Sequence, residues 1–267
     1  MPILMQCSRT AVPTLLSLIN GAGLSSGLLV CLDAGDPSSY NGSGQTWTNV
    51  APDATTDFYL GVLNSVESVD PVFTGNVGDP YAYFNVPQYG GFIETTGGWD
   101  DAFVKDNCAW TAIFIYYRPS GTPANTQNLY TVGKYSTSPG SRIGYMATGY
   151  MTYYLDPTSA AGSVSVTSTT QLVPTEQICF LGYSIKDATS SSIFQIGSSQ
   201  ETVNTNNSQS NTAGPSGASA IGRYPDVTTQ GSMANVRYYG VAIWNTNLSA
   251  TQLNSLRTSL LNRWSGI

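Results

Sequence analysis

Hydrophobic and polar residues follow one another in short alternating runs along most of the chain, and this pattern predicts an all-β protein. The runs are rich in β-branched and aromatic residues, and Gly, Pro and Asn separate them. Many short strands with little helix favour a sandwich or a barrel. The predicted strands cover residues 28–33, 58–63, 82–86, 91–94, 109–117, 129–135, 143–146, 151–155, 163–167, 177–185, 192–196, 220–222 and 234–244.

Three of these runs are apolar almost throughout, namely residues 109–117, 177–185 and 234–244. A strand that is covered on both faces loses the polar half of its alternation. We therefore expect these three strands in the middle of a sheet.

One amphipathic helix is predicted near the C-terminal end of the sequence. Ser249 and Gln252 have the spacing of a capping box, and apolar residues then recur at helical spacing. We expect this helix to dock on the sandwich. Its apolar face consists of Leu253, Leu256, Leu260, Leu261 and Trp264.

Residues 1–26 are interpreted as an N-terminal arm in front of a single sandwich domain, residues 27–267. Residues 14–19 within this N-terminal arm predict one or two helical turns, which Asn20 and Gly21 would end. We expect the N-terminal arm to hold the protein to its partners, and the sandwich to fold without it.

The composition predicts a surface that is polar but nearly uncharged. Charged residues make up 10% of the 267 residues, against about 25% in typical globular proteins. A net charge of −6 with only ten Lys and Arg argues against nucleic-acid binding, which needs clustered cations. No apolar run approaches the length of a membrane span, so no membrane contact is expected.

The four cysteines lie far apart and form no C-x-x-C pair, so no zinc or other cofactor is expected. Most of them stand inside apolar runs, where a free thiol behaves as a small buried hydrophobe. We expect reduced core thiols and folding in a reducing cytoplasm, with a disulfide as the alternative. The cysteines are Cys7, Cys31, Cys108 and Cys179.

Three stretches carry a family resemblance. They are "LLVCLDAGDPSSYNGSGQTWTNVAPDATTDFYLG", then "AYFNVPQYGGFIE" with "CAWTAIFIYYRP", and finally "IGRYPDVTTQGSMANVRYYGVAIWNTNLSATQLNSL". Together they resemble the opening strand and turn, the edge and central strands, and the closing strand and helix of the concanavalin A-like lectin/glucanase superfamily, in its laminin-G-like or pentraxin-like branch. The resemblance implies an antiparallel two-sheet jelly-roll sandwich. Domains with this opening motif are frequent in bacteriophage virion proteins.

The inventory of side chains argues against an enzyme. The absence of histidine removes Ser/His and Cys/His nucleophile systems and the commonest general base. A glycosidase needs two carboxylates roughly 5 to 10 Å apart, and the family's glucanases carry theirs in a Glu-x-Asp-x-x-Glu motif that this chain lacks. We expect no catalytic residues, although an acid pair assembled from separate strands stays open. The glutamates are Glu67, Glu94, Glu176 and Glu201.

An acidic turn follows the first predicted strand. Asp33, Asp36 and Asn41 carry oxygen ligands of the kind that Ca²⁺ prefers. Turn chemistry explains the same residues, because Pro37 suits the second position of a turn and Asp36 caps the backbone at the first. We favour the turn and expect no metal, with a calcium site as the alternative.

Two loops carry candidate sugar-binding residues, since sugar rings stack on aromatic faces and their hydroxyls need polar partners. Trp99 precedes Asp100 and Asp101 in one loop, and Tyr40 flanks the first loop. We predict these four residues as ligand-binding. Trp47 also flanks the first loop, but its place in the family-like stretch favours a plug at the end of the sandwich.

These observations predict a non-enzymatic structural or interaction protein, namely an auxiliary component of a bacteriophage virion that decorates the capsid or belongs to a fibre or tail. We expect it to be made in the host cytoplasm and to reside in the virion. Its expected partners are other virion proteins, copies of itself held through the N-terminal arm, and host surface glycans. A free carbohydrate-binding lectin is the alternative, followed by a glycoside hydrolase.

Overall fold

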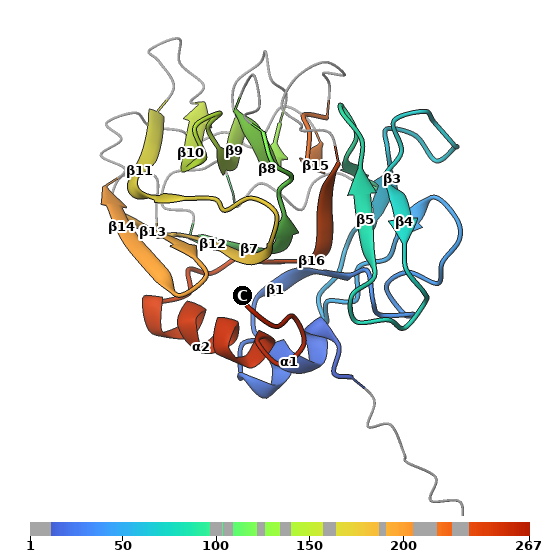
Figure 1. Ribbon diagram of the computed structural model, residues 1–267, viewed down its shortest axis with the longest axis horizontal. Helices are drawn as coiled ribbons and strands as arrows, with labels where there is room; N and C mark the ends of the chain where they lie inside the picture. Colours follow the sequence, from blue (N-terminus) through green and yellow to red (C-terminus); the bar gives the residue numbers. More distant parts are fainter. Residues whose placement is uncertain are drawn as a thin grey trace, which may run out of the picture.

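The computed structural model describes residues 12–96, 103, 109–121, 126–133, 140–156, 164–186, 191–204, 218–225 and 235–267. They form two eight-stranded sheets, here called sheet A and sheet B, and two helices (Figure 1). The predicted all-β sandwich of two antiparallel sheets with a C-terminal helix is confirmed.

Sheet A joins strands from both ends of the sequence. β16 (Val236–Trp244) lies in its centre, with β7 (Trp110–Tyr117) on one side. On the other side, β5 (Tyr83–Val86) pairs with the first part of β16, and β1 (Leu28–Asp33) pairs with the second. The sheet continues beyond β7 with β12 (Ile178–Ile185), β13 (Ser191–Ile196) and β14 (Ser199–Asn204), and beyond β5 with β4 (Val72–Thr74).

Sheet B lies opposite sheet A and is built mainly from neighbouring hairpins. Its order is β11 (Val164–Leu172), β10 (Tyr150–Asp156), β9 (Gly140–Tyr145), β8 (Gln127–Val132), β15 (Ser219–Ile221), β6 (Phe92–Glu94), β3 (Phe58–Leu60) and β2 (Thr46–Trp47).

Every strand predicted from the sequence has a counterpart in the two sheets. The prediction missed β2, β4 and β14. β2 and β4 have two and three residues, which is too short for an alternating pattern to show. β14 reads SQETVN and offers only Val203 to the interior, so its sequence resembles a loop.

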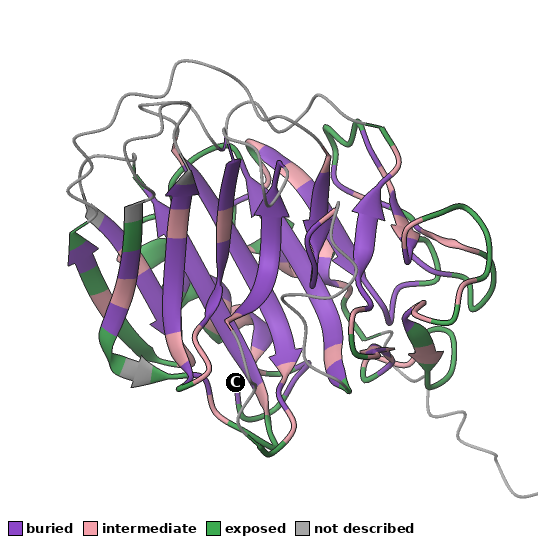
Figure 2. Ribbon diagram, turned by 90° about the horizontal axis from the view of Figure 1, so that it is seen from above, coloured by how far each residue is buried: buried purple, intermediate pink, exposed green. Residues whose placement is uncertain are grey.

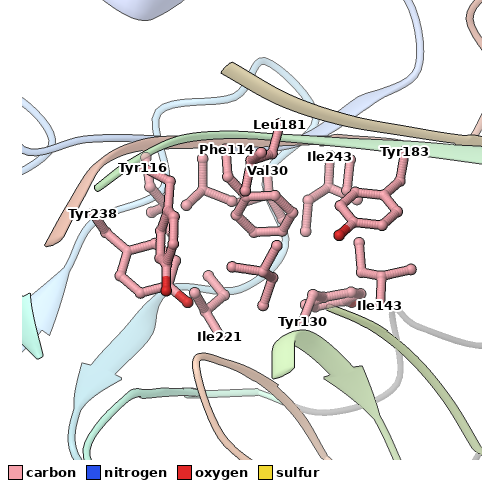
Figure 3. Close-up of a cluster of buried hydrophobic side chains, with 14 of the residues drawn as sticks. Val30, Phe114, Tyr116, Tyr130, Ile143, Leu181, Tyr183, Ile221, Tyr238 and Ile243 are labelled. Carbon is pink, nitrogen blue, oxygen red and sulfur yellow. The ribbon is translucent and has the colours of Figure 1, made fainter. Parts of the chain in front are cut away.

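The two sheets enclose an apolar core. Alternation along each strand sends every second side chain inward, as with Phe114 and Leu181 from sheet A and Tyr130 and Ile143 from sheet B. Figure 3 shows these side chains meeting between the sheets. Figure 2 shows that the strands in the middle of the sheets are buried along most of their length.

Both helices begin at a residue whose side chain caps the first turn. α1 (Leu15–Gly21) begins after Thr14, whose hydroxyl accepts the N–H of the third residue of the first turn. α2 (Ala250–Leu260) begins after Ser249, which forms the predicted capping box with Gln252. Neither helix of the described part of the chain has the length and apolar character needed to cross a membrane.

The helices cover the outer face of sheet A and create a second apolar cluster there (Figure 1). Ile113 and Ile115 of β7, together with Trp244 of β16, join Leu15 of α1 and Leu256 of α2 in this outer cluster. β7, β12 and β16 thus bury both of their faces. This confirms the central positions predicted from their continuous apolar runs.

A buried ion pair connects Asp33 at the end of β1 with Arg263, which follows α2. Arg263 donates two hydrogen bonds to the Asp33 carboxylate, both at 2.6 Å. The same carboxylate accepts the N–H of Leu15 at 2.8 Å and of Gly35 at 3.0 Å, and Arg263 also reaches the carbonyl oxygen of Pro13. Burial raises the pKa of the Asp33 carboxyl, while Arg263 and the two N–H groups oppose that rise.

The described part of the N-terminal arm packs on the sandwich. Leu15 and Ile19 are fully buried in the outer cluster, and the indole N–H of Trp244 donates to the carbonyl oxygen of Leu24 at 2.7 Å. Residues 1–11 lie outside the described residues, so the predicted division of the chain at residue 26 stays a prediction.

Two of the four cysteines lie in the described part of the chain. Cys31 and Cys179 are buried and free, as predicted for core thiols. Burial raises the pKa of the Cys179 thiol to about 12 and that of Cys31 well above its ordinary value. Both thiols therefore stay protonated and unreactive. Cys7 and Cys108 lie outside the described residues.

The two outer edges of sheet A differ. At β14, Glu201 accepts hydrogen bonds of 2.8–3.2 Å from the N–H and hydroxyl groups of Thr169 and Thr170 in β11 of sheet B. Burial raises the pKa of the Glu201 carboxyl, but these bonds lower it below its ordinary value. At the other edge, β4 pairs only with β5 among the described strands.

Candidate functional site: a neutral loop cavity beside Tyr40

The loop between β1 and β2 begins with an Asx turn. The side chain of Asp36 accepts the N–H of Ser38 at 2.8 Å, and its carbonyl oxygen accepts the N–H of Ser39 and of Tyr40 at 2.9 Å. This confirms the prediction that Asp36 caps a turn. Within the described part of the chain, no three His, Cys, Asp or Glu side chains are placed to hold a metal ion.

Ser39 and Asn41 fix the shape of the loop from within. The Ser39 hydroxyl donates to the carbonyl oxygen of Thr48 at 2.7 Å and accepts the N–H of Asp33 at 3.1 Å. Asn41 accepts both the N–H and the hydroxyl of Ser43 at 3.1 Å. Asn41 is thus also a turn residue, and its amide oxygen is used inside the loop.

Tyr40 anchors the loop to the core. Its ring packs edge-on against Phe84, with 4.8 Å between centroids, and at a tilt against Phe73, with 5.1 Å between centroids. The residue is left 6% exposed. Its hydroxyl donates to the carbonyl oxygen of Gly44 at 3.1 Å. Burial raises the pKa of Tyr40, so the hydroxyl stays protonated at neutral pH.

A cavity of about 250 Å³ opens within this loop; we call it the Tyr40 cavity. Hydroxyl, amide and backbone groups line it, and no lining residue carries a charge. Among the described residues, the buried side-chain oxygen of Gln45 finds no hydrogen-bond partner. The lining residues are Pro37, Ser38, Ser39, Tyr40, Asn41, Ser43, Gly44, Gln45, Thr46 and Thr48.

The chemistry of this lining suits a small neutral ligand with several hydroxyl groups. Ser and Thr hydroxyls and the Asn and Gln amides both donate and accept hydrogen bonds. The volume lies below the range of about 300 to 1,000 Å³ that drug-sized ligands occupy. One sugar ring is a ligand of matching size and polarity.

Of the predicted binding residues, the structure places Tyr40 in the wall of this cavity. Trp99, Asp100 and Asp101 lie outside the described residues, so their part of the prediction stays untested. Gln45 and Thr48 could not be predicted as lining residues from the sequence, because only the folded loop brings them beside Ser38.

Trp47 plugs the interior, as predicted. It is fully buried, and its ring packs against Phe84 at 4.7 Å and against Phe92 at 4.8 Å. Its indole face is therefore closed to a sugar. Tyr40 and Trp47 flank the same loop, yet only Tyr40 reaches the cavity.

Three of the described carboxylates accept hydrogen bonds from nearby backbone or hydroxyl groups. Glu67 accepts the N–H groups of Val62 and Leu63, and Asp70 accepts the N–H of Glu67 at 2.7 Å. Burial and, to a smaller extent, the neighbouring Glu67 raise the pKa of Asp70. Glu94 in β6 accepts the hydroxyl of Ser219 at 2.8 Å. These contacts give Glu67, Asp70 and Glu94 roles in local structure.

No known protein family matches the chain, and no curated protein matches it. Solved structures do resemble it. The Trypanosoma rangeli sialidase has a TM-score of 0.56 and 15% identity over 90% of this chain. Domain 4 of AbnA, a GH43 extracellular arabinanase from Geobacillus stearothermophilus, in complex with arabinotriose, has a TM-score of 0.56 and 14% identity over 86% of this chain and 98% of the domain. The botulinum neurotoxin serotype G binding domain has a TM-score of 0.59 and 12% identity over 86% of this chain and 50% of the other.

These likenesses show a shared β-sandwich fold of the lectin-like kind. The chain spans about a third (34%) of the sialidase chain that it matches, and nearly the whole of the arabinanase domain. The fold is thus one that occurs both as a part of larger proteins and as a binding domain.

Proposed function

We propose that the protein is a non-enzymatic interaction protein whose lectin-like sandwich binds a neutral sugar in the Tyr40 cavity. The uncharged, hydroxyl- and amide-rich lining of that cavity carries the proposal. The likeness to an arabinanase domain in complex with arabinotriose supports it as an analogy of fold. The absence of histidine and the structural use of Glu67, Asp70 and Glu94 support a role without catalysis.

A glycan array followed by calorimetry tests sugar binding. For any glycan that binds, Gln45→Ala is expected to raise the dissociation constant about tenfold, because it removes an amide that provides one or two hydrogen bonds. Gln177→Ala, which truncates an exposed amide outside the cavity, serves as the matched control and should leave binding unchanged.

The location of the site is tested by a second variant. If Trp99→Ala abolishes binding and Gln45→Ala does not, the sugar binds at the predicted Trp99, Asp100 and Asp101 site instead. Release of reducing sugar from a polysaccharide panel would contradict the non-enzymatic part of the proposal.

We further propose that the protein works as an auxiliary component of a bacteriophage virion, in a capsid decoration or in a fibre or tail. Domains with an opening motif like that of this chain are frequent in bacteriophage virion proteins, which supports this role, as does the low share of charged residues, 10%. Mass spectrometry of density-purified particles is expected to find the protein at a fixed ratio to the major capsid protein. A protein found only in the soluble fraction of the lysate would contradict the virion role.

A further inference from the structure

One stretch of the described chain is unusually rich in exposed apolar side chains. Of the large hydrophobic side chains that are exposed among the described residues, most lie within residues 61–82, on β4 and the loops that flank it. Val66 is 83% exposed and Val72 is 59% exposed. We call this region the β4 surface. It consists of Leu63, Val66, Val72, Val77 and Tyr81.

The β4 surface includes an open sheet edge at Val72. β4 pairs with β5 through Val72, Phe73 and Thr74, and among the described strands it has no partner on its other side. The N–H and C=O groups on the free side of an edge strand are available to a further segment of chain. Both the apolar side chains and the backbone therefore favour docking of a peptide segment.

The charge of the β4 surface argues against contact between two such surfaces. Residues 61–82 contain Glu67, Asp70 and Asp79 and no Lys or Arg. A two-fold contact would bring the same acids of both copies together, and like charges at close range repel. A complementary partner must be apolar and carry no acidic residue.

Residues 1–11 of this chain have that composition. They read MPILMQCSRTA, with an apolar run over residues 1–5, one cation at Arg9 and no acidic residue. Fully extended, eleven residues reach about 36 Å. This length is enough to cross from one molecule to a neighbouring one in contact with it.

The N-terminal end of α1 also lies close to the β4 surface. Arg263 binds the carbonyl oxygen of Pro13. A Cβ atom placed on Gly35 would meet both Arg263 and the carbonyl oxygen of Asp79, so these groups are neighbours. Asp79 lies in the β4–β5 turn, which Figure 1 shows near the start of α1.

We propose that residues 1–11 of one copy dock on the β4 surface of a second copy. Docking within one molecule is less favourable. β4 runs toward the β4–β5 turn, and residues 1–11 would also run toward that turn, because the chain enters α1 beside it. A segment of the same chain would therefore run parallel to β4, whereas all strand pairs of the two sheets are antiparallel in the described residues. The segment of a second copy is free to approach in the antiparallel direction, which is the more stable one.

Cross-linking tests this contact, because Cys7 supplies a thiol within the docking segment. In the 267-residue chain, Val72→Cys adds to the four cysteines already present a thiol on the β4 surface. Mild oxidation of a mixture of ¹⁵N-labelled and unlabelled copies is expected to give disulfides between Cys7 and position 72 that join the two isotopes. Leu172→Cys, at an exposed apolar position of β11, is the matched control and should give at least tenfold less.

Sedimentation gives an independent measurement without any introduced thiol. Deletion of residues 1–11, and separately the exposed double substitution Val66→Asp and Val72→Asp, are expected to shift the full-length oligomer to monomer with unchanged circular dichroism. Cross-links confined to single copies, equal yields for Leu172→Cys, or an unchanged mass after both alterations would overturn the proposal. None of these readouts involves sugar binding, so the proposal stands or falls independently of the Tyr40 cavity.

Discussion

Replacement of Arg263 by Met is expected to lower the free energy of unfolding by about 3 to 5 kcal/mol, because it leaves the Asp33 carboxylate buried without its counter-charge. The Met side chain fills much of the space of the arginine stem, so loss of charge dominates over loss of packing. Urea denaturation monitored by circular dichroism measures the change.

The matched control is Arg257→Met in α2, which removes a half-exposed guanidinium that donates to the carbonyl oxygen of Ile267. It should cost about 1 to 2 kcal/mol, because the two hydrogen bonds of Arg257, to Ile267 and to Asn254, lie at a half-exposed site. The double variant Asp33→Leu with Arg263→Met should recover part of the loss, because an apolar pair replaces an ion pair without leaving a buried charge. Equal losses for the two arginine variants would contradict the importance of the buried pair.

Deletion of residues 1–26 is expected to yield a chain that fails to fold at 25 °C, whereas deletion of residues 1–11 should leave a chain that still folds. The longer deletion removes Leu15 and Ile19 from the outer cluster, and loss of a buried Leu or Ile side chain costs about 2 to 5 kcal/mol even when only truncated to Ala. A typical domain has about 5 to 15 kcal/mol in total. Thermal unfolding and near-ultraviolet circular dichroism of the two products measure the difference.

A point variant separates packing from chain length. Ile19→Asp in the full chain should destabilise nearly as much as the longer deletion, because it places a charge in the outer cluster. Ser17→Asp, on the same helix, changes an exposed position outside that cluster and is the control. A folded product lacking residues 1–26, with normal thermal stability, would instead support the sequence-based expectation of a sandwich that folds without its N-terminal arm.

The sequence carried enough local information to predict most of the fold. The continuous apolar run of β7 indicated a strand covered on both faces, and the structure shows why, since Phe114 faces the other sheet while Ile113 faces the helices. The capping box at Ser249 and Gln252 likewise depends on residues three positions apart. Such signals survive in the sequence because neighbours in the chain produce them.

Contacts between distant residues left no comparable signal. Asp33 looked like a turn residue or a calcium ligand, and its partner Arg263 stands 230 residues away. Tyr40 was singled out as an aromatic residue beside a polar loop, but its ring faces the core and only the folded loop creates a cavity beside it. The β4 edge was missed because three residues cannot display a period.

The central place of β16 in sheet A has a consequence for the order of events during synthesis. β16 follows every other strand in the sequence, yet β1, β5 and β7 all pair with it. On the ribosome, the earlier strands of this sheet emerge before their central partner has been synthesised. Their apolar faces stay exposed until residues 236–244 leave the exit tunnel. This nascent chain is therefore expected to fold late rather than progressively, with the apolar strands of sheet A unpaired until then.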